Sequence, residues 1–220
     1  MLRPRSDLFL QHFLASRQAV DIPIKHLFVE YKFWIERHTP FGTVEEEPAT
    51  LARQGGDFRR IIEAKKSDPI YGLVTFLDRF DIRTAYPMLL TLLDADIDEI
   101  SWAAVSVTLE SYLLRRAVCG LTTKNYNRIF LQLTRALRRD GTTHETLVKH
   151  LSGLTGDSAT WPTDNEFRSA WAARHVYHTL NNPKVVHIFR RLNVAMLGPK
   201  TEPISIEGSS AEFVGESGLG

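Results

Sequence analysis

Helical periodicity recurs along almost the whole chain and constrains its fold more than any other feature. Apolar residues return every three or four positions, as on the buried face of an amphipathic helix. No segment shows the alternation of apolar and polar residues that is typical of a half-buried strand. We therefore predict an all-α fold, with a single helical domain of about ten helices over residues 1–197 and a flexible, disordered tail over residues 198–220.

Capping residues predict where these helices begin and end, because Ser, Thr, Asp and Asn accept hydrogen bonds from the first turn and Gly often follows the last. Thr163 and Glu166 form the spacing of a capping box, as do Thr43 and Glu46. The expected helices start close to Ser6, Asp21, Thr43, Asp68, Thr84, Asp98, Thr123, Thr142, Thr163 and Asn182. Gly120 and Gly141 are expected to end the sixth and seventh helices.

The expected sixth helix carries apolar side chains on two sides. One side holds Trp102, Val105, Leu109, Tyr112 and Leu113, and the other holds Ala103, Val107, Leu114 and Val118. Because a helix that is apolar all round is normally buried, this pattern predicts that the sixth helix is the central helix of the fold.

Composition excludes several classes of protein. Hydrophobic residues make up 43% of the 220 and charged residues 24%, and the formal net charge of +1 means that nucleic-acid binding would need a local basic patch. Cys119 is the sole cysteine, so an internal disulfide and a multi-cysteine zinc site are both excluded. The sequence shows neither an apolar run of about 18 residues nor a signal peptide, so we expect a cytoplasmic protein without a membrane span.

The expected seventh helix is divided into an apolar face and a basic face. No acidic residue stands between Glu110 and Asp140. At about 100° per residue, an arc of roughly 100° holds five basic side chains, those of Lys124, Arg128, Arg135, Arg138 and Arg139. Nucleic-acid-binding candidates are Arg115, Lys124, Asn125, Arg128, Arg135, Arg138 and Arg139. The basic face could follow a phosphate backbone, dock on an acidic partner domain, or be a solvated surface.

The segment before this helix, Leu121–Asn125, places two threonines and a lysine at a helix start. Helix N-termini bind phosphate, but capping alone also explains the threonines, and we favour capping.

No complete catalytic constellation is visible. His175 and His178 lack a third ligand at a recognisable spacing, so we expect no metal site. Cys119 has no obvious histidine partner and is interpreted as a buried structural thiol. Neither a glycine-rich phosphate loop nor a Gly-x-Ser-x-Gly motif is present. We expect no catalytic residue and no cofactor.

Several segments resemble one family, the GmrSD-type restriction endonucleases. The segment Arg115–Phe130, with the sequence RRAVCGLTTKNYNRIF, strongly resembles a signature of that family. Trp161–Phe167 is similar to its Trp-Pro-x-Asp-x-x-Phe segment, Leu180–Lys184 to the stretch that follows it, and Asp7–Gln11 to the entry into its helical middle region. The resemblance covers residues 2–207 and implies a helical region that is not itself catalytic.

In that family a ParB-like N-terminal domain hydrolyses nucleotide through an Asp-Gly-Gln-Gln-Arg motif, and a C-terminal HNH-type domain cuts DNA, often modified phage DNA. This sequence contains neither motif. Phe213 stands where the resemblance would place the nuclease histidine, and a phenyl ring neither ligates a metal nor takes a proton. The resemblance therefore implies a chain without its own nuclease activity, whose tail is a remnant of the start of an HNH domain.

Three interpretations follow from the resemblance. The first is a non-catalytic helical linker that contacts DNA and couples nucleotide-binding and nuclease domains or subunits in anti-phage defence. The second is a stand-alone helical module for protein interactions. The third is the remnant of a truncated or decayed nuclease gene.

Overall fold

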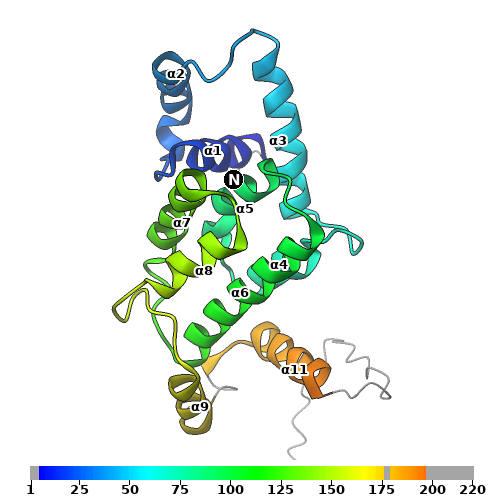
Figure 1. Ribbon diagram of the computed structural model, residues 1–220, viewed down its shortest axis with the longest axis vertical. Coiled ribbons are helices and arrows are strands. Elements are labelled where there is room, and N and C mark those ends of the chain that lie inside the picture. Colours follow the sequence, from blue (N-terminus) through cyan, green and yellow to red (C-terminus); the bar gives the residue numbers. More distant parts are fainter. Residues whose placement is uncertain (1–4, 176–178, 197–220) are drawn as a thin grey trace, which may run out of the picture. The chain divides into compact units, whose positions relative to one another are not determined.

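A computed structural model describes residues 5–175 and 179–196 (Figure 1). These residues form ten α-helices and two 3-10 helices, and none of them lies in a strand, which confirms the all-α prediction. The predicted tail lies outside the described residues, and the domain boundary at residue 197 stays a prediction. The chain divides into two compact units, Met1–Arg174 and His175–Gly220, and each is described by itself.

The first unit contains all but one of the α-helices in the described part of the chain. They are α1 (Arg5–Gln18), α2 (Leu27–His38), α3 (Glu46–Ile62), α4 (Tyr71–Arg79), α5 (Tyr86–Asp94), α6 (Glu99–Val118), α7 (Tyr126–Asp140), α8 (His144–Ser152) and α9 (Asp164–Ala173). The 3-10 helices η1 (Ile24–His26) and η2 (Arg83–Ala85) lead directly into α2 and α5. The second unit contains α11 (Asn182–Met196).

Two of the predicted caps are confirmed by their hydrogen bonds. The Asp98 carboxylate accepts from the backbone N–H of Ser101 at 2.7 Å, and Thr163 and Glu166 form a complete capping box at the start of α9. The predicted start of α8 was one residue early, since Thr143 is its N-cap.

The predicted capping box at the start of α3 was wrong. The N-cap of α3 is Glu45, without a side-chain cap, and the Glu46 carboxylate instead accepts from the N–H of Gly42 at 2.6 Å. Pro48 falls in the first helical turn, where a missing N–H leaves no intrahelical hydrogen bond unmade. The Glu46 carboxylate, which the sequence pattern assigned to the start of the helix, therefore bonds to the preceding loop instead.

The predicted central position of the sixth helix was wrong. Val107, on the second face of α6, is 59% exposed, whereas every residue of α5 from Tyr86 to Leu93 is buried. Helices α1, α3 and α7 all pack on α5, which therefore lies at the centre of the first unit (Figure 1). The sequence pattern misled because single apolar residues are common on protein surfaces, and because a helix as short as α5 shows little periodicity.

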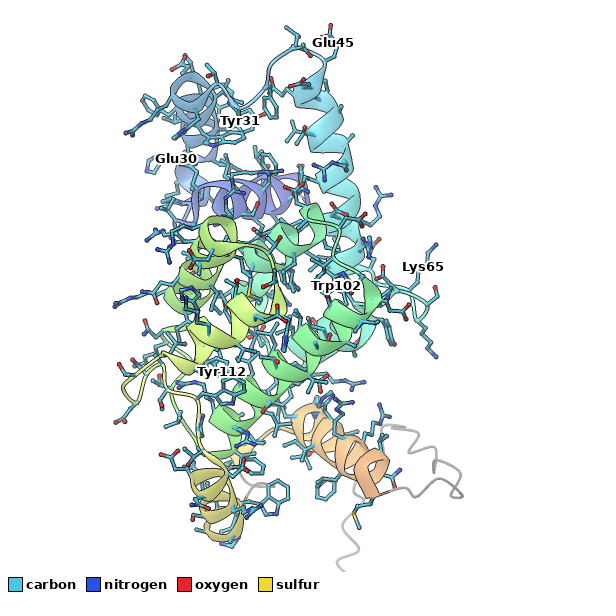
Figure 2. All side chains as sticks on the ribbon, viewed as in Figure 1. Glu30, Tyr31, Glu45, Lys65, Trp102 and Tyr112 are labelled. Atoms are coloured by element: carbon cyan, nitrogen blue, oxygen red, sulfur yellow. The ribbon has the colours of Figure 1, made fainter. Side chains whose placement is uncertain are left out.

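Helix α6 nevertheless presents one fully buried face to the core. Trp102 and Tyr112 lie toward opposite ends of this helix (Figure 2). Leu109, between them, is completely buried. On this side α6 packs against α4 and α8, while its C-terminal half also contacts α9. The helix thus joins the core to the segment that carries the resemblance.

The predicted apolar face of α2 was only partly right. Leu27 and Trp34 are buried, but Phe28 is 77% exposed and the first turn is 3-10 rather than α-helical. Asp21 does not cap the element, because Pro23 occupies the N-cap position of η1.

The apolar side of α11 is likewise only partly buried: Val185 and Ile188 are buried, whereas Leu192 and Met196 are exposed. The predicted single buried face of this helix was therefore too long. None of the helices described is both long and apolar enough to span a membrane.

Candidate nucleic-acid interface

Helix α7 presents a basic surface to solvent because its apolar residues are drawn into the core. Ile129, Phe130, Leu133 and Leu137 are almost completely buried. The outward positions carry cations, and we call Lys124, Arg128, Arg135 and Arg139 the basic stripe. All four residues are exposed. The amphipathic division predicted for this helix is thus present.

The stripe runs along the helix axis. Arg128, Arg135 and Arg139 fall within about 40° of one another at 100° per residue. At 1.5 Å per residue they span roughly 16 Å, a length over which one strand of duplex DNA carries about five phosphates. The spacing is therefore suited to several contacts with one strand.

The cations of the stripe differ in their availability. No carboxylate pairs with Lys124, Arg128 or Arg135 in the described part of the chain, although Arg135 donates to the backbone carbonyl of Ala19 at 3.0 Å. Arg139 is held by Asp140 through two hydrogen bonds of 2.6 and 2.8 Å. Lys124, Arg128 and Arg135 therefore keep a positive charge that no described carboxylate neutralises, whereas the charge of Arg139 is already neutralised by Asp140.

Asp140 closes the stripe at its C-terminal end. Its carboxylate lies 2.8 Å from Nε2 of His150 as well as bonding Arg139. The hydrogen bond from Arg139, and then that from His150, lower the pKa of Asp140 far below its usual range. Asp140 therefore stays charged and limits the basic surface at this end.

Arg138 lies at the edge of the predicted basic arc, and the structure places it beside a cavity instead of on the stripe. Helical geometry explains the difference, because residue 138 is rotated about 60° from Arg135. Its environment is described below.

The start of α7 gives little support to a phosphate site. The helix begins at Tyr126, later than predicted, and its N-cap Asn125 makes no capping hydrogen bond with its side chain. The Asn125 amide instead donates to Ser158, and Thr122 accepts from the N–H of Lys124. The threonine thus stabilises the preceding turn and does not cap the helix as expected.

Arg115, a predicted nucleic-acid contact, is occupied by protein groups. It lies 2.6 Å from a carboxylate oxygen of Asp164, donates to the carbonyl of Pro162 at 3.2 Å, and stands over the Phe167 ring. These contacts fix the start of α9 to the C-terminal end of α6. We therefore leave Arg115 out of the proposed interface and assign it a structural role.

Arg116 is a residue whose importance sequence reasoning underestimated. Its side chain is completely buried, donating to the carbonyls of Thr160 at 2.7 Å, Thr122 at 2.8 Å and Asp157 at 3.3 Å. Its guanidinium also stands 5.6 Å from the ring centroids of Tyr112 and Tyr126. Arg116 therefore ties the loop before α7 to the loop before α9.

The two segments that most clearly carry the resemblance meet at this point. The Tyr112 hydroxyl donates to the carbonyl of Ala159 at 2.8 Å, and its ring meets that of Trp161 edge to face. Arg115 joins 115–130 to 161–167, and the contacts of Tyr112 and Arg116 lie beside it. These residues build one packed junction, and the stripe extends from it along α7.

Gly120 ends α6 in a left-handed conformation that favours glycine. Its φ is +68°, and the N–H of Leu121 returns to the carbonyl of Arg116 at 2.9 Å. The guanidinium of Arg174 covers the space that a Cβ would take and donates to the carbonyl of Cys119. The predicted helix end at Gly120 is confirmed. The close approach of the Arg174 guanidinium is a second reason why glycine is favoured at this position.

We predict that Gly120→Ala destabilises the protein by about 1–3 kcal/mol, since the left-handed conformation is strained for alanine and Arg174 must move. Urea denaturation measures the difference in unfolding free energy. Gly56→Ala is the matched control: Gly56 lies inside α3 with free space around it, so alanine should stabilise by about 0.5–1 kcal/mol. If both variants were as stable as the parent, this role for Gly120 would be contradicted.

Other chemically active side chains form no site in the described part of the chain. Cys119 is partly buried, and burial raises its pKa, so its thiol is not activated. His178, one of the two histidines considered for a metal, lies outside the described residues. Among residues that are described, no group of three His, Cys, Asp or Glu side chains is placed to hold a metal ion.

Comparisons with protein-family models, with curated proteins and with solved structures gave no significant match to this chain. A functional assignment therefore rests on the residues themselves and on the motif resemblance.

Proposed function

We propose that this chain is the helical, non-catalytic region of a GmrSD-like anti-phage restriction endonuclease, and that it contacts DNA through the basic stripe of α7. In such a protein it would couple nucleotide-binding and nuclease domains or subunits while holding DNA by its backbone. The observation that carries the proposal is the stripe itself, whose cations Lys124, Arg128 and Arg135 face solvent with no carboxylate partner among the residues that the structure describes.

The surroundings of the stripe support a rigid interface. The junction at Arg116 fixes the start of α7, and the buried apolar face of α7 fixes its rotation. Cations held on a rigid helix lose little backbone freedom when they meet phosphate, so even a few contacts can give measurable affinity. Contacts of this kind are indifferent to base sequence, which suits a region that positions DNA for a separate nuclease.

A second candidate function is protein interaction through α2. Phe28 and Phe33 are 77% and 62% exposed, and Val29 between them is 48% exposed. Exposed aromatic side chains on one helix are more typical of an interaction surface than of a solvated one. On this view the basic stripe would dock on an acidic partner domain and would show no DNA affinity of its own.

The proposal predicts weak, sequence-independent DNA binding with a steep salt dependence. With three or four phosphate contacts, the logarithm of affinity should fall against the logarithm of salt with a slope of about −2.7 to −3.6. This is shallower than the slope of about −4.5 expected if Arg138 and all four residues of the stripe met phosphate, because Arg138 lies at the cavity and Arg139 is paired with Asp140. An electrophoretic titration of a duplex at two salt concentrations measures the slope, and a second duplex of scrambled sequence is the control. The absence of binding at low salt would favour the protein-interaction function.

A further inference from the structure

A cavity of about 620 Å³ opens between the C-terminal ends of α1 and α7, the helix α2 and the start of α3. This volume lies within the range of small-molecule sites, roughly 300–1,000 Å³. Its polar wall is formed by Arg17, Arg53, Arg138 and His38. All of these residues lie in the first unit, and the described elements that carry them are placed by the core around α5.

The guanidinium groups outnumber the carboxylates that neutralise them. Arg17 and Arg53 share the carboxylate of Asp94, at 2.7 and 2.6 Å, and Arg53 also lies 4.0 Å from a carboxylate oxygen of Asp57. Arg138 has no carboxylate at ion-pair distance in the part of the chain that is described. Glu46 also lines the cavity and keeps its negative charge, since the N–H of Gly42 that it accepts is neutral. Three arginines and one glutamate line the cavity, so the charge of its wall is net positive.

The guanidinium of Arg138 is held in a position unfavourable to its charge. Burial lowers its pKa, and the neighbouring Arg17 lowers it further, while Asp94 acts in the opposite direction. An anion in the cavity would relieve both effects, because it would replace lost hydration and screen the two cations from each other.

Aromatic side chains also line the cavity. Trp34 and Phe41 line it with their rings edge to face, at 5.8 Å between centroids. In Figure 2 the labelled Tyr31, on the same helix as Trp34, lies on the side of α2 that faces α3. A ligand with an anionic group and a flat or apolar group would therefore meet suitable side chains for each group.

We propose that this cavity is a binding site for a phosphate-bearing ligand, with Arg17, Arg53 and Arg138 around the phosphate and Trp34 and Phe41 against its less polar part. Guanidinium groups suit phosphate because they donate paired hydrogen bonds to its oxygens. The site does not depend on the DNA interface proposed above, since Arg17 and Arg53 lie on other helices. The phosphate could belong to a free nucleotide or to a DNA strand that reaches past the end of the stripe.

Isothermal titration of the whole chain with inorganic pyrophosphate, ATP and a short duplex tests the site. Two control variants separate the cavity from general charge: Arg138→Gln is compared with Arg83→Gln in η2, and Arg53→Gln with Arg59→Gln on the same helix, where neither control residue lines the cavity. Losing one charge-assisted contact should weaken pyrophosphate binding by about 10- to 100-fold in Arg138→Gln and Arg53→Gln, with little change in either control. Thermal unfolding checks that each variant is folded.

The same titrations identify the source of the phosphate. If it belongs to a free nucleotide, ATP should bind more tightly than pyrophosphate, and Arg53→Gln should leave duplex affinity unchanged. If the phosphate belongs to DNA, pyrophosphate should compete with the duplex for binding, and Arg53→Gln should lower the affinity for the duplex. The proposal is overturned if pyrophosphate and ATP do not bind at millimolar concentration, or if control and cavity variants weaken binding equally. A failure of DNA binding at the stripe alone would leave pyrophosphate binding intact.

Discussion

Replacing Arg116 by methionine should destabilise the protein by about 3–5 kcal/mol, the cost of removing one partner from a buried charged network. The side chain is completely buried, and its loss leaves the carbonyls of Thr122, Asp157 and Thr160 without their donor. Methionine has a similar length but cannot donate, so packing is largely kept while the hydrogen bonds are lost. In a unit of this size the melting temperature should fall by roughly 6–20 °C.

Arg115→Met, the same substitution one residue earlier, is the control. Arg115 is 25% exposed and its partner Asp164 is 67% exposed, so this ion pair should contribute no more than about 1 kcal/mol. Urea denaturation of both variants gives the difference in unfolding free energy. A cost for Arg115→Met equal to or above that for Arg116→Met would show that Arg116 does not hold the junction.

The contrast between Arg115 and Arg116 shows what sequence reasoning can and cannot predict here. Adjacent residues on a helix point about 100° apart, so a pattern of basic residues places them near one another without saying which side meets the core. Arg116 turns inward because the loop that follows α6 and a loop distant in sequence supply its acceptors. Those loops, at 121–125 and 153–163, have no periodicity that would have predicted their approach.

Local chemistry was predicted well where a few neighbouring residues decide the structure. The caps at Asp98 and Thr163 and the helix ends at Gly120 and Gly141 need only short-range hydrogen bonds or a positive φ. The amphipathic division of α7 was predictable for the same reason, and the five residues expected on its apolar side are all buried: Tyr126, Ile129, Phe130, Leu133 and Leu137. Burial between helices was less predictable, as the central position of α5 shows, because it depends on which elements pack together.

The cavity beside Arg138 could not be predicted from any local pattern. Its lining comes from α1, α2, α3 and α7, and the charges of Arg17, Arg53 and Arg138 approach one another only after these helices pack. The sequence signal for Arg138 was its place in the basic arc, which led to its assignment to the DNA-binding face. Its position at the edge of that arc, about 60° from Arg135, was the one sign that it faces elsewhere.

Reversing both Arg128 and Arg135 to glutamate should weaken DNA binding on the order of 100-fold at low salt. Each reversal removes a charge-assisted contact to phosphate and adds a repulsive carboxylate, and the slope against salt should become shallower by about 1.8. Both residues are exposed on the side of α7 away from the core, so the fold should persist. The hydrogen bond from Arg135 to Ala19 is a single contact, and thermal unfolding records the effect of losing it.

The matched control is Lys65→Glu with Lys66→Glu, which changes the net charge by the same amount. Both lysines are exposed in the loop between α3 and α4, and Figure 2 shows Lys65 well separated from α7. The central test is one electrophoretic titration of the parent and both double variants on the same duplex at low salt. The account predicts that the parent and the lysine variant bind alike while the arginine variant loses most of its affinity. Equal loss in both variants, or no binding by the parent, would contradict a DNA-binding role for the stripe.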